Sequence, residues 1–174
     1  PLPVDDGDAD ARGFERVLAE WDSEGLRVPS VSVNFSPLSF RAGLPGLIAA
    51  LLDENGLTPD RLTIEVTESV VMDDTSVATA WQIRDLGVGL SVDDFGTGFS
   101  AIARLPFLPI TELKIDRSFL EGIDENPAYT ALTRAVVGIG ESLGLRVIAE
   151  GVETVRQAEL LGQIGCPLGQ GFLF

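Results

Sequence analysis

The sequence contains no histidine and only one cysteine, Cys166, among its 174 residues. Without histidine, the chain cannot use Ser-His-Asp or Cys-His catalysis, a histidine general base or histidine-ligated zinc. A single cysteine cannot form an internal disulfide and fits a reducing compartment. We therefore expect a cytoplasmic protein, or the cytoplasmic domain of a membrane-anchored parent.

Positive charge is also scarce, because 12 Lys and Arg residues face 27 Asp and Glu residues, for a net charge of −15. This acidity argues against DNA and against an anionic membrane surface as the main partner. The longest apolar runs, such as residues 44–52, span only about ten residues and cannot cross a bilayer. A small anionic ligand would need metal cations or local basic residues to offset the acidic field.

What remains is globular composition, with 45% hydrophobic and 22% charged residues, which predicts one domain over residues 1–174. Residues 1–12 are expected to be a loop or frayed end. Short β-branched runs predict strands at 31–35, 62–66, 88–92, 112–115, 146–149 and 171–174. Helical periodicity predicts helices at 13–21, 44–55, 74–86, 128–143 and 155–164.

Such repeated βα units form either an open doubly wound sheet or a closed barrel. The chain lacks the glycine-rich phosphate loop expected of a doubly wound nucleotide fold. In a barrel, functional residues come from the carboxyl ends of many strands. We therefore predict an α/β fold, a TIM-type (β/α)8 barrel that is incomplete here, with about six βα units visible.

Polar side chains recur where the predicted strands end. They are Asn34, Glu65 with Glu68, Asp93 with Asp94, Lys114 with Asp116, and Glu150 with Glu153. An isolated acid after a strand is usually a helix cap or a solvated loop residue, but five successive strands ending this way indicate a shared site. Carboxylate and amide oxygens without His or Cys suit Mg²⁺ or Mn²⁺. Two such ions, bridged by a carboxylate, could polarise a phosphate oxygen and lower the pKa of a bound water.

Three details of this pattern carry further expectations. Asp93 and Asp94 would point to opposite faces of a regular strand, but at a strand end both can face one centre. Lys114 is expected to point into the barrel mouth, where it could hold a water or neutralise phosphate charge; the alternative is that it merely offsets the acidic cluster. The glycines in the loop 94–99 permit a tight turn over the site, although a plain βα turn would look the same.

Six segments, at 32–36, 64–69, 92–98, 113–119, 149–154 and 169–172, resemble in order the signature motifs of the EAL-domain phosphodiesterases. The resemblance implies a (β/α)8-type barrel, commonly a homodimer, that hydrolyses the bacterial second messenger cyclic di-GMP to linear pGpG with Mg²⁺ or Mn²⁺. It also implies a sensory or GGDEF-type domain elsewhere in the parent chain.

The resemblance also assigns roles to individual residues. Asn34, Glu65 and Asp93 correspond to ligands of one metal ion, and Asp93, Asp94 and Glu150 to ligands of a second. Glu150 with Lys114 would position or deprotonate the attacking water. The residues that would anchor the glycine-containing loop or support the site and the substrate are Glu68, Asp116, Glu153 and Gln170.

The Glu-Ala-Leu tripeptide that names the family does not occur in these residues. We expect the strands that carry it to lie upstream of Pro1. If the parent has instead lost them, the chain would be a catalytically inactive cyclic di-GMP receptor or signalling scaffold. A third interpretation is an enolase-like lyase, because that chemistry also uses hard-metal ligands and a strand-end lysine.

Overall fold

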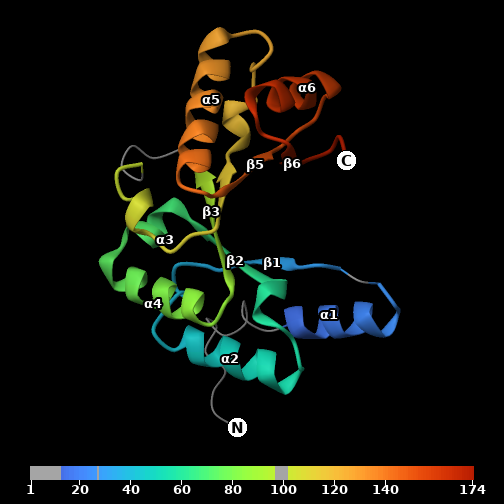
Figure 1. Cartoon of the computed structure of the whole chain (residues 1–174), viewed down its shortest axis with the longest axis vertical. Coiled ribbons are helices and arrows are strands. Elements are labelled where there is room, and N and C mark those ends of the chain that lie inside the picture. The colour runs from blue at the N-terminus through green and yellow to red at the C-terminus, as the bar shows by residue number, and fades with distance from the viewer. Residues whose placement is uncertain (1–12, 27, 97–101) are drawn as a thin grey trace. The chain divides into compact units, whose positions relative to one another are not determined.

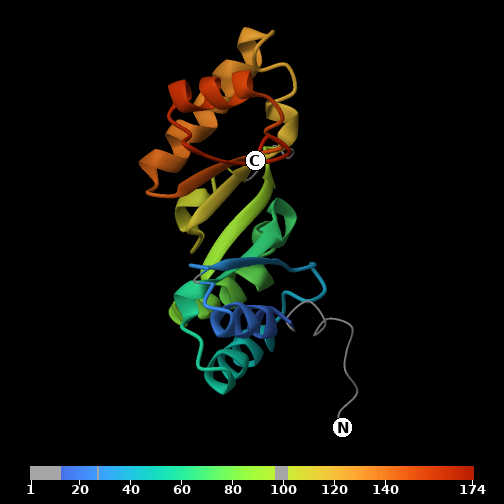
Figure 2. The same ribbon diagram turned by 90° about the vertical axis from the view of Figure 1, so that its right-hand side faces the viewer.

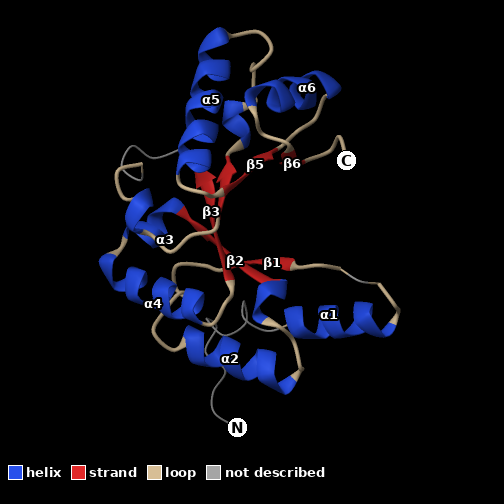
Figure 3. Cartoon of the chain, viewed as in Figure 1, coloured by secondary structure: helices blue, strands red, loops and turns tan. Residues whose placement is uncertain are grey.

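The computed structural model describes the whole chain except residues 1–12, 27 and 97–101. The predicted frayed end, and residues 97–99 of the glycine-containing loop at 94–99, therefore lie outside the described residues. Strands and helices alternate along the chain (Figures 1 and 3). The strands are β1 (Val31–Asn34), β2 (Leu62–Thr67), β3 (Gly89–Phe95), β4 (Glu112–Ile115), β5 (Arg146–Glu150) and β6 (Leu168–Gln170).

The helices occupy most of the gaps between strands. The α-helices are α1 (Phe14–Ser23), α2 (Leu44–Glu54), α3 (Glu68–Met72), α4 (Asp74–Asp85), α5 (Pro127–Ser142) and α6 (Val155–Ile164). The short three-ten helices are η2 (Pro59–Arg61), η3 (Leu105–Phe107) and η4 (Arg117–Phe119). None of the helices in the described part of the chain is both long and apolar enough to span a membrane.

The strands follow one another in the sheet in chain order, β1-β2-β3-β4-β5-β6. The pairs β1–β2, β4–β5 and β5–β6 are parallel. A doubly wound sheet reverses its strand order at a switch point, whereas a TIM-type barrel adds each strand beside the previous one. The chain order therefore confirms the predicted fold class, consecutive βα units of an incomplete TIM-type (β/α)8 barrel.

The chain divides into two compact units, which we describe separately. The first unit comprises Pro1–Ser91 and Phe107–Ile110, and the second comprises Val92–Pro106 and Thr111–Phe174. In the first unit, α1 buries Phe14 and Leu18 and contacts β1. Strand β2 is buried along nearly its whole length, as expected for a parallel strand that is covered on both faces.

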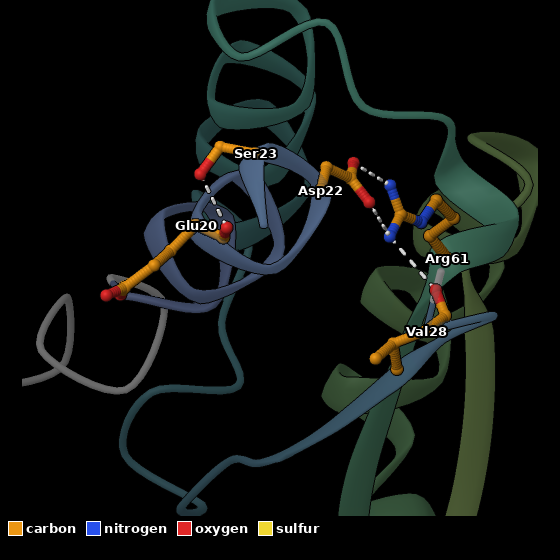
Figure 4. Close-up of polar contacts among 5 residues, drawn as sticks. All are labelled: Glu20, Asp22, Ser23, Val28 and Arg61. Atoms are coloured by element: carbon orange, nitrogen blue, oxygen red, sulfur yellow. Dashed lines mark hydrogen bonds and ion pairs between the residues drawn. The ribbon is translucent and has the colours of Figure 1, made fainter. Parts of the chain in front are cut away.

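Arg61 forms a clasp in the first unit between α1 and the start of β2 (Figure 4). Its Nη1 lies 2.5 Å from Oδ2 of Asp22, its Nη2 donates to Oδ1 of Asp22 at 3.0 Å, and Nη2 also donates to the Val28 carbonyl at 3.0 Å. Nearby, the Ser23 hydroxyl donates to the Glu20 carbonyl at 2.7 Å and so satisfies one carbonyl of the last turn of α1. The clasp thus fixes the end of α1 beside η2.

In the second unit, α5 contacts β4, β5 and α6, and the two helices lie on one side of β5 and β6 (Figures 1 and 2). The Asn126 side chain caps α5 by accepting a hydrogen bond from the Ala128 N–H at 3.0 Å. Thr154 and Gln157 form a capping box at the start of α6, which fixes the chain just after β5.

The predicted helices and the first five predicted strands are confirmed, with boundaries that differ by a few residues. The last predicted strand, at 171–174, is wrong, because β6 is Leu168–Gln170. Aromatic residues suggested the later segment, but the Phe172 and Phe174 side chains are 94% and 78% exposed. Pairing with β5 decides the position instead, since Gln170 lies opposite Glu150, where β5 ends.

Candidate metal centre

Three carboxylates from the ends of β3 and β5 converge in the second unit. Asp93, Asp94 and Glu150 each offer a carboxylate oxygen, and these oxygens lie within 4.8 Å of one another. We call this group the carboxylate centre. Ligand oxygens lie roughly 2.0–2.6 Å from Mg²⁺ or Ca²⁺, so two ligands of one ion are at most about 5 Å apart. The three residues therefore fit a hard divalent cation.

The backbone turn at the end of β3 makes this convergence feasible. Asp94 has a φ of +54°, in the left-handed region that aspartate tolerates better than most residues. Its N–H donates to Oδ1 of Asp93 at 3.0 Å. The two adjacent carboxylates consequently face a common centre instead of opposite faces of the strand, as expected at a strand end.

Lys114, the only lysine of the chain, lies between carboxylates. Its side chain is only 5% exposed, and its Nζ lies 2.6 Å from Oε1 of Glu150 and 3.7 Å from Oδ1 of Asp93. Gln170, opposite Glu150 in the register of β5 and β6, donates its Nε2–H to the same Oε1 at 2.5 Å. Both donors therefore contact the same oxygen of Glu150.

The crowding of carboxylates changes their acidity. Burial raises the pKa of Glu150; the Lys114 ammonium opposes this increase, and the Asp93 carboxylate adds to it. Burial also raises the pKa of Asp94, and the charges of Asp93 and Asp116 raise it further. One ammonium thus faces more negative charge than it can neutralise, which is the electrostatic condition that favours binding of a further cation.

Asp116 follows β4 and begins η4. Burial alone would raise its pKa, but hydrogen bonds from Ser118 and the backbone of Arg117 hold the pKa of Asp116 below its ordinary value. Its Oδ1 accepts the Ser118 N–H at 3.0 Å, so the carboxylate caps this short helix. Asp116 therefore contributes a fixed negative charge near Asp94.

The other predicted site residues have different surroundings. In the first unit, Asn34 and Glu65 are register partners at the carboxyl ends of β1 and β2; Asn34 is exposed and Glu65 is 5% exposed. Glu68, 9% exposed, is the first residue of α3. Glu153 is exposed in the second unit, where its N–H donates to Oε1 of Gln157 at 2.8 Å. Among the described residues, the carboxylate centre does not include Glu153.

The helix η4 lies closer to the residues after β3 and β5 than the sequence predicted. The signal was available in the glycines Gly96 and Gly151, which follow the acidic residues Asp94 and Glu150 at short spacing. A glycine inside such a motif often marks a place where another group comes close to the backbone. Which group approaches could not be read from the sequence.

Known proteins similar to this chain belong to one family. A family model for the EAL domain matches residues 10–174. The chain is 48% identical to the oxygen sensor protein DosP of Escherichia coli K12 over 162 residues, which is 91% of this chain and 20% of DosP. The chain spans 20 to 26% of the length of the curated relatives that it matches, so those relatives contain other regions as well.

Two solved structures are similar along nearly the whole chain. The MucR phosphodiesterase of Pseudomonas aeruginosa, in complex with c-di-GMP, is 40% identical with a TM-score of 0.85; the match covers 92% of this chain and 66% of that one. BlrP1 of Klebsiella pneumoniae, in a manganese and cy-diGMP complex, is 30% identical with a TM-score of 0.87, covering 100% of this chain and 45% of that one. The chain belongs to the EAL domain family.

Proposed function

We propose that residues 1–174 are part of a single EAL-type domain that hydrolyses cyclic di-GMP to linear pGpG. The reaction would use two metal ions, either Mg²⁺ or Mn²⁺. The observation that carries the proposal is the carboxylate centre itself, in which Asp93, Asp94 and Glu150 offer oxygens within 4.8 Å of one another. Similarity to proteins solved with c-di-GMP and with manganese supports the choice of substrate and metal.

In this proposal, Asn34, Glu65 and Asp93 would hold one ion, and Asp93, Asp94 and Glu150 would hold the other. Divalent ions at such a centre supply charge stabilisation for a phosphoryl group and acidify a nearby water. The carboxylate and amide oxygens suit these hard ions, and the excess of negative charge around Asp94 favours their binding.

Glu150 is the proposed proton acceptor for the attacking water. A base whose pKa is raised toward the working pH takes a proton more readily, and burial raises the pKa of Glu150. Lys114 and Gln170 hold Oε1 of Glu150 at 2.6 and 2.5 Å, so the carboxylate is fixed in orientation. Lys114 also offers positive charge toward the phosphate of a dianionic substrate.

The remaining predicted residues have supporting roles in this proposal. Glu68, Asp116 and Glu153 would steady the loops around the centre, and Gln170 would do so through Glu150. We also propose that the parent protein works as a homodimer in the cytoplasm, with a sensory or GGDEF-type domain in another part of its chain.

The test measures conversion of cyclic di-GMP to pGpG by the purified protein at saturating Mn²⁺. We expect Glu150→Gln to lower kcat by about 10³-fold, because it removes the base while preserving the side-chain shape. The matched control is Glu159→Gln on α6, whose side chain is 56% exposed and pairs with Arg156 at 3.4 Å. It should leave kcat unchanged. Tight nucleotide binding without turnover in the wild type would instead identify a receptor.

A further inference from the structure

The short helix η4 (Arg117–Phe119) lies directly after β4, the strand that carries Lys114. Its start is fixed by the Asp116 carboxylate, which accepts the Ser118 N–H at 3.0 Å. Its end is fixed by the Leu120 N–H, which donates to the Arg117 carbonyl at 2.8 Å. Leu120 is 1% exposed, so the helix is anchored in the core of the second unit at that end.

One end of η4 contacts the turn that follows β3. Gly96, two residues after Asp94, has a φ of +100°. A Cβ atom at this position would overlap with Cζ of Phe119 and would lie 2.6 Å from its Cε2. The phenyl ring therefore lies against the Gly96 backbone more closely than any other residue type at position 96 would allow.

The other end of η4 contacts the turn that follows β5. Gly151, directly after Glu150, has a φ of +69°. A Cβ atom here would lie 2.6 Å from Cβ of Arg117 and 3.6 Å from its Cα. The same three-residue helix thus contacts the turns behind both strands that supply the carboxylate centre.

From these contacts we infer that η4 is a positioning element for the carboxylate centre, with Phe119 as its principal positioning residue; this inference rests on the proposed function. Asp93 and Asp94 come from β3 and Glu150 from β5, so their spacing depends on two separate turns. Contacts from one rigid helix to both turns fix that spacing. Displacement of a site residue by about 1 Å can cost roughly 10²-fold in rate.

The burial of Phe119 separates this role from general packing. Phe95, at the end of β3, is 1% exposed and belongs to the core, whereas Phe119 is only partly buried. Truncating Phe119 should consequently affect the geometry of the turn more than the stability of the fold. The reciprocal change, Gly96→Ala, would force a Cβ into the ring at a φ that alanine rarely adopts.

The test is Mn²⁺ binding to the purified protein without nucleotide, measured by titration calorimetry together with Tm. We expect Phe119→Ala to raise the Mn²⁺ Kd by about 10-fold, as loss of an outer contact at a metal site commonly does. Phe119→Leu should recover part of that loss, because it keeps apolar bulk against Gly96. At saturating Mn²⁺, kcat should fall while KM for cyclic di-GMP changes less than about threefold.

Two further variants keep the result interpretable. Phe107→Ala, in the three-ten helix η3 and with a side chain 74% exposed, is the matched control and should leave the Mn²⁺ Kd unchanged. Gly96→Ala should weaken binding even if Phe119→Ala folds poorly, and the double variant should be no worse than the poorer single one. If both Phe119→Ala and Gly96→Ala bind Mn²⁺ with wild-type affinity, the positioning role of η4 is overturned, but the proposed metal site is not. Absence of Mn²⁺ binding by the wild type would overturn the proposed metal site as well.

Discussion

Arg61 in the first unit and Lys114 in the second both lie among oxygen atoms, but their surroundings differ. In the first unit, Arg61 makes a bidentate pair with Asp22, whose side chain is 42% exposed. In the second, Lys114 is 5% exposed and faces both Glu150 and Asp93, whose side chains are 17% and 18% exposed. Water can replace the partner of the first cation, whereas the second is surrounded by more negative charge than it can neutralise.

This difference separates a contact that supports the fold from one that prepares a site. A one-to-one pair near the surface contributes little to stability, because solvent screens it and both side chains lose freedom. A buried lysine among several carboxylates compensates their negative charge. Removing it leaves that buried charge without a partner, which is strongly destabilising. Three substitutions or conditions can test the comparison.

The largest effect is expected from Lys114→Met, which removes the cation and keeps the apolar stem. We expect kcat for cyclic di-GMP to fall by about 10²-fold, since both the orientation of Glu150 and a positive charge are lost. Without metal, Tm should also fall, because Asp93 and Glu150 then repel each other across a partly buried site. Added Mn²⁺ should restore much of the Tm.

The same variant decides between the two interpretations of this lysine. If Lys114 only offsets the acidic cluster, excess Mn²⁺ should restore turnover together with Tm, and that result would contradict a catalytic role. Arg146→Met is the matched control: Arg146 pairs with Glu112 at 3.1 Å in the same unit, but its side chain is 60% exposed. It should leave kcat unchanged.

A smaller effect is expected when the pH is lowered. Carboxylates must lose their protons to bind a metal ion, and the pKa values of Glu150 and Asp94 are raised by burial. A raised pKa means that the proton is held to a higher pH, so Mn²⁺ affinity is present above that pKa and is lost as the pH falls through it. We therefore expect Mn²⁺ to bind more weakly in acidic buffer than at neutral pH.

Titration calorimetry at several pH values measures this dependence. Glu150→Gln cannot be protonated at this position, so its Mn²⁺ affinity should be lower throughout and should vary less with pH. An equally steep pH dependence in this variant would show that proton competition occurs elsewhere. The exposed Glu159→Gln variant should reproduce the wild-type curve.

The sequence predicted the strand-end residues of this centre because parallel strands end at one edge of the sheet. Asp93, Asp94, Lys114 and Glu150 could be named from that rule together with the order of the motifs. The left-handed backbone of Asp94 and the hydrogen bond from Gln170 to Glu150 could not. They depend on the turn after β3 and on the register of β6, which no local residue pattern specifies.

The position of β6 could not be predicted from local sequence either. The aromatic run at 171–174 has strand-forming composition, yet β6 ends at Gln170. Pairing with β5 decides where the strand lies, and the Val152 N–H and Gln170 carbonyl are joined at 3.0 Å just beyond the last register pair. A propensity-based prediction cannot include a hydrogen-bonding partner that lies about 20 residues away in the sequence.

The smallest effect is expected from Arg61→Met, which removes the clasp of the first unit and retains an apolar side chain. Its guanidinium contacts Asp22 and the Val28 carbonyl, both of which belong to the first unit. We expect Tm to fall by only roughly 2–4 °C. The loss is small because water can hydrate the Asp22 carboxylate once its partner is gone. Turnover and Mn²⁺ affinity should stay within about twofold of the wild type.

Asp22→Asn provides the reciprocal test of the clasp, since it keeps the side-chain shape and removes only the negative charge. Its effect on Tm should be no larger than that of Arg61→Met, and the double variant should resemble Arg61→Met, because all three remove the same pair. High salt should reduce the difference between wild type and variants. A loss of Mn²⁺ affinity in Arg61→Met comparable to that in Lys114→Met would mean that the two cations are not separable, and the comparison between the units would fail.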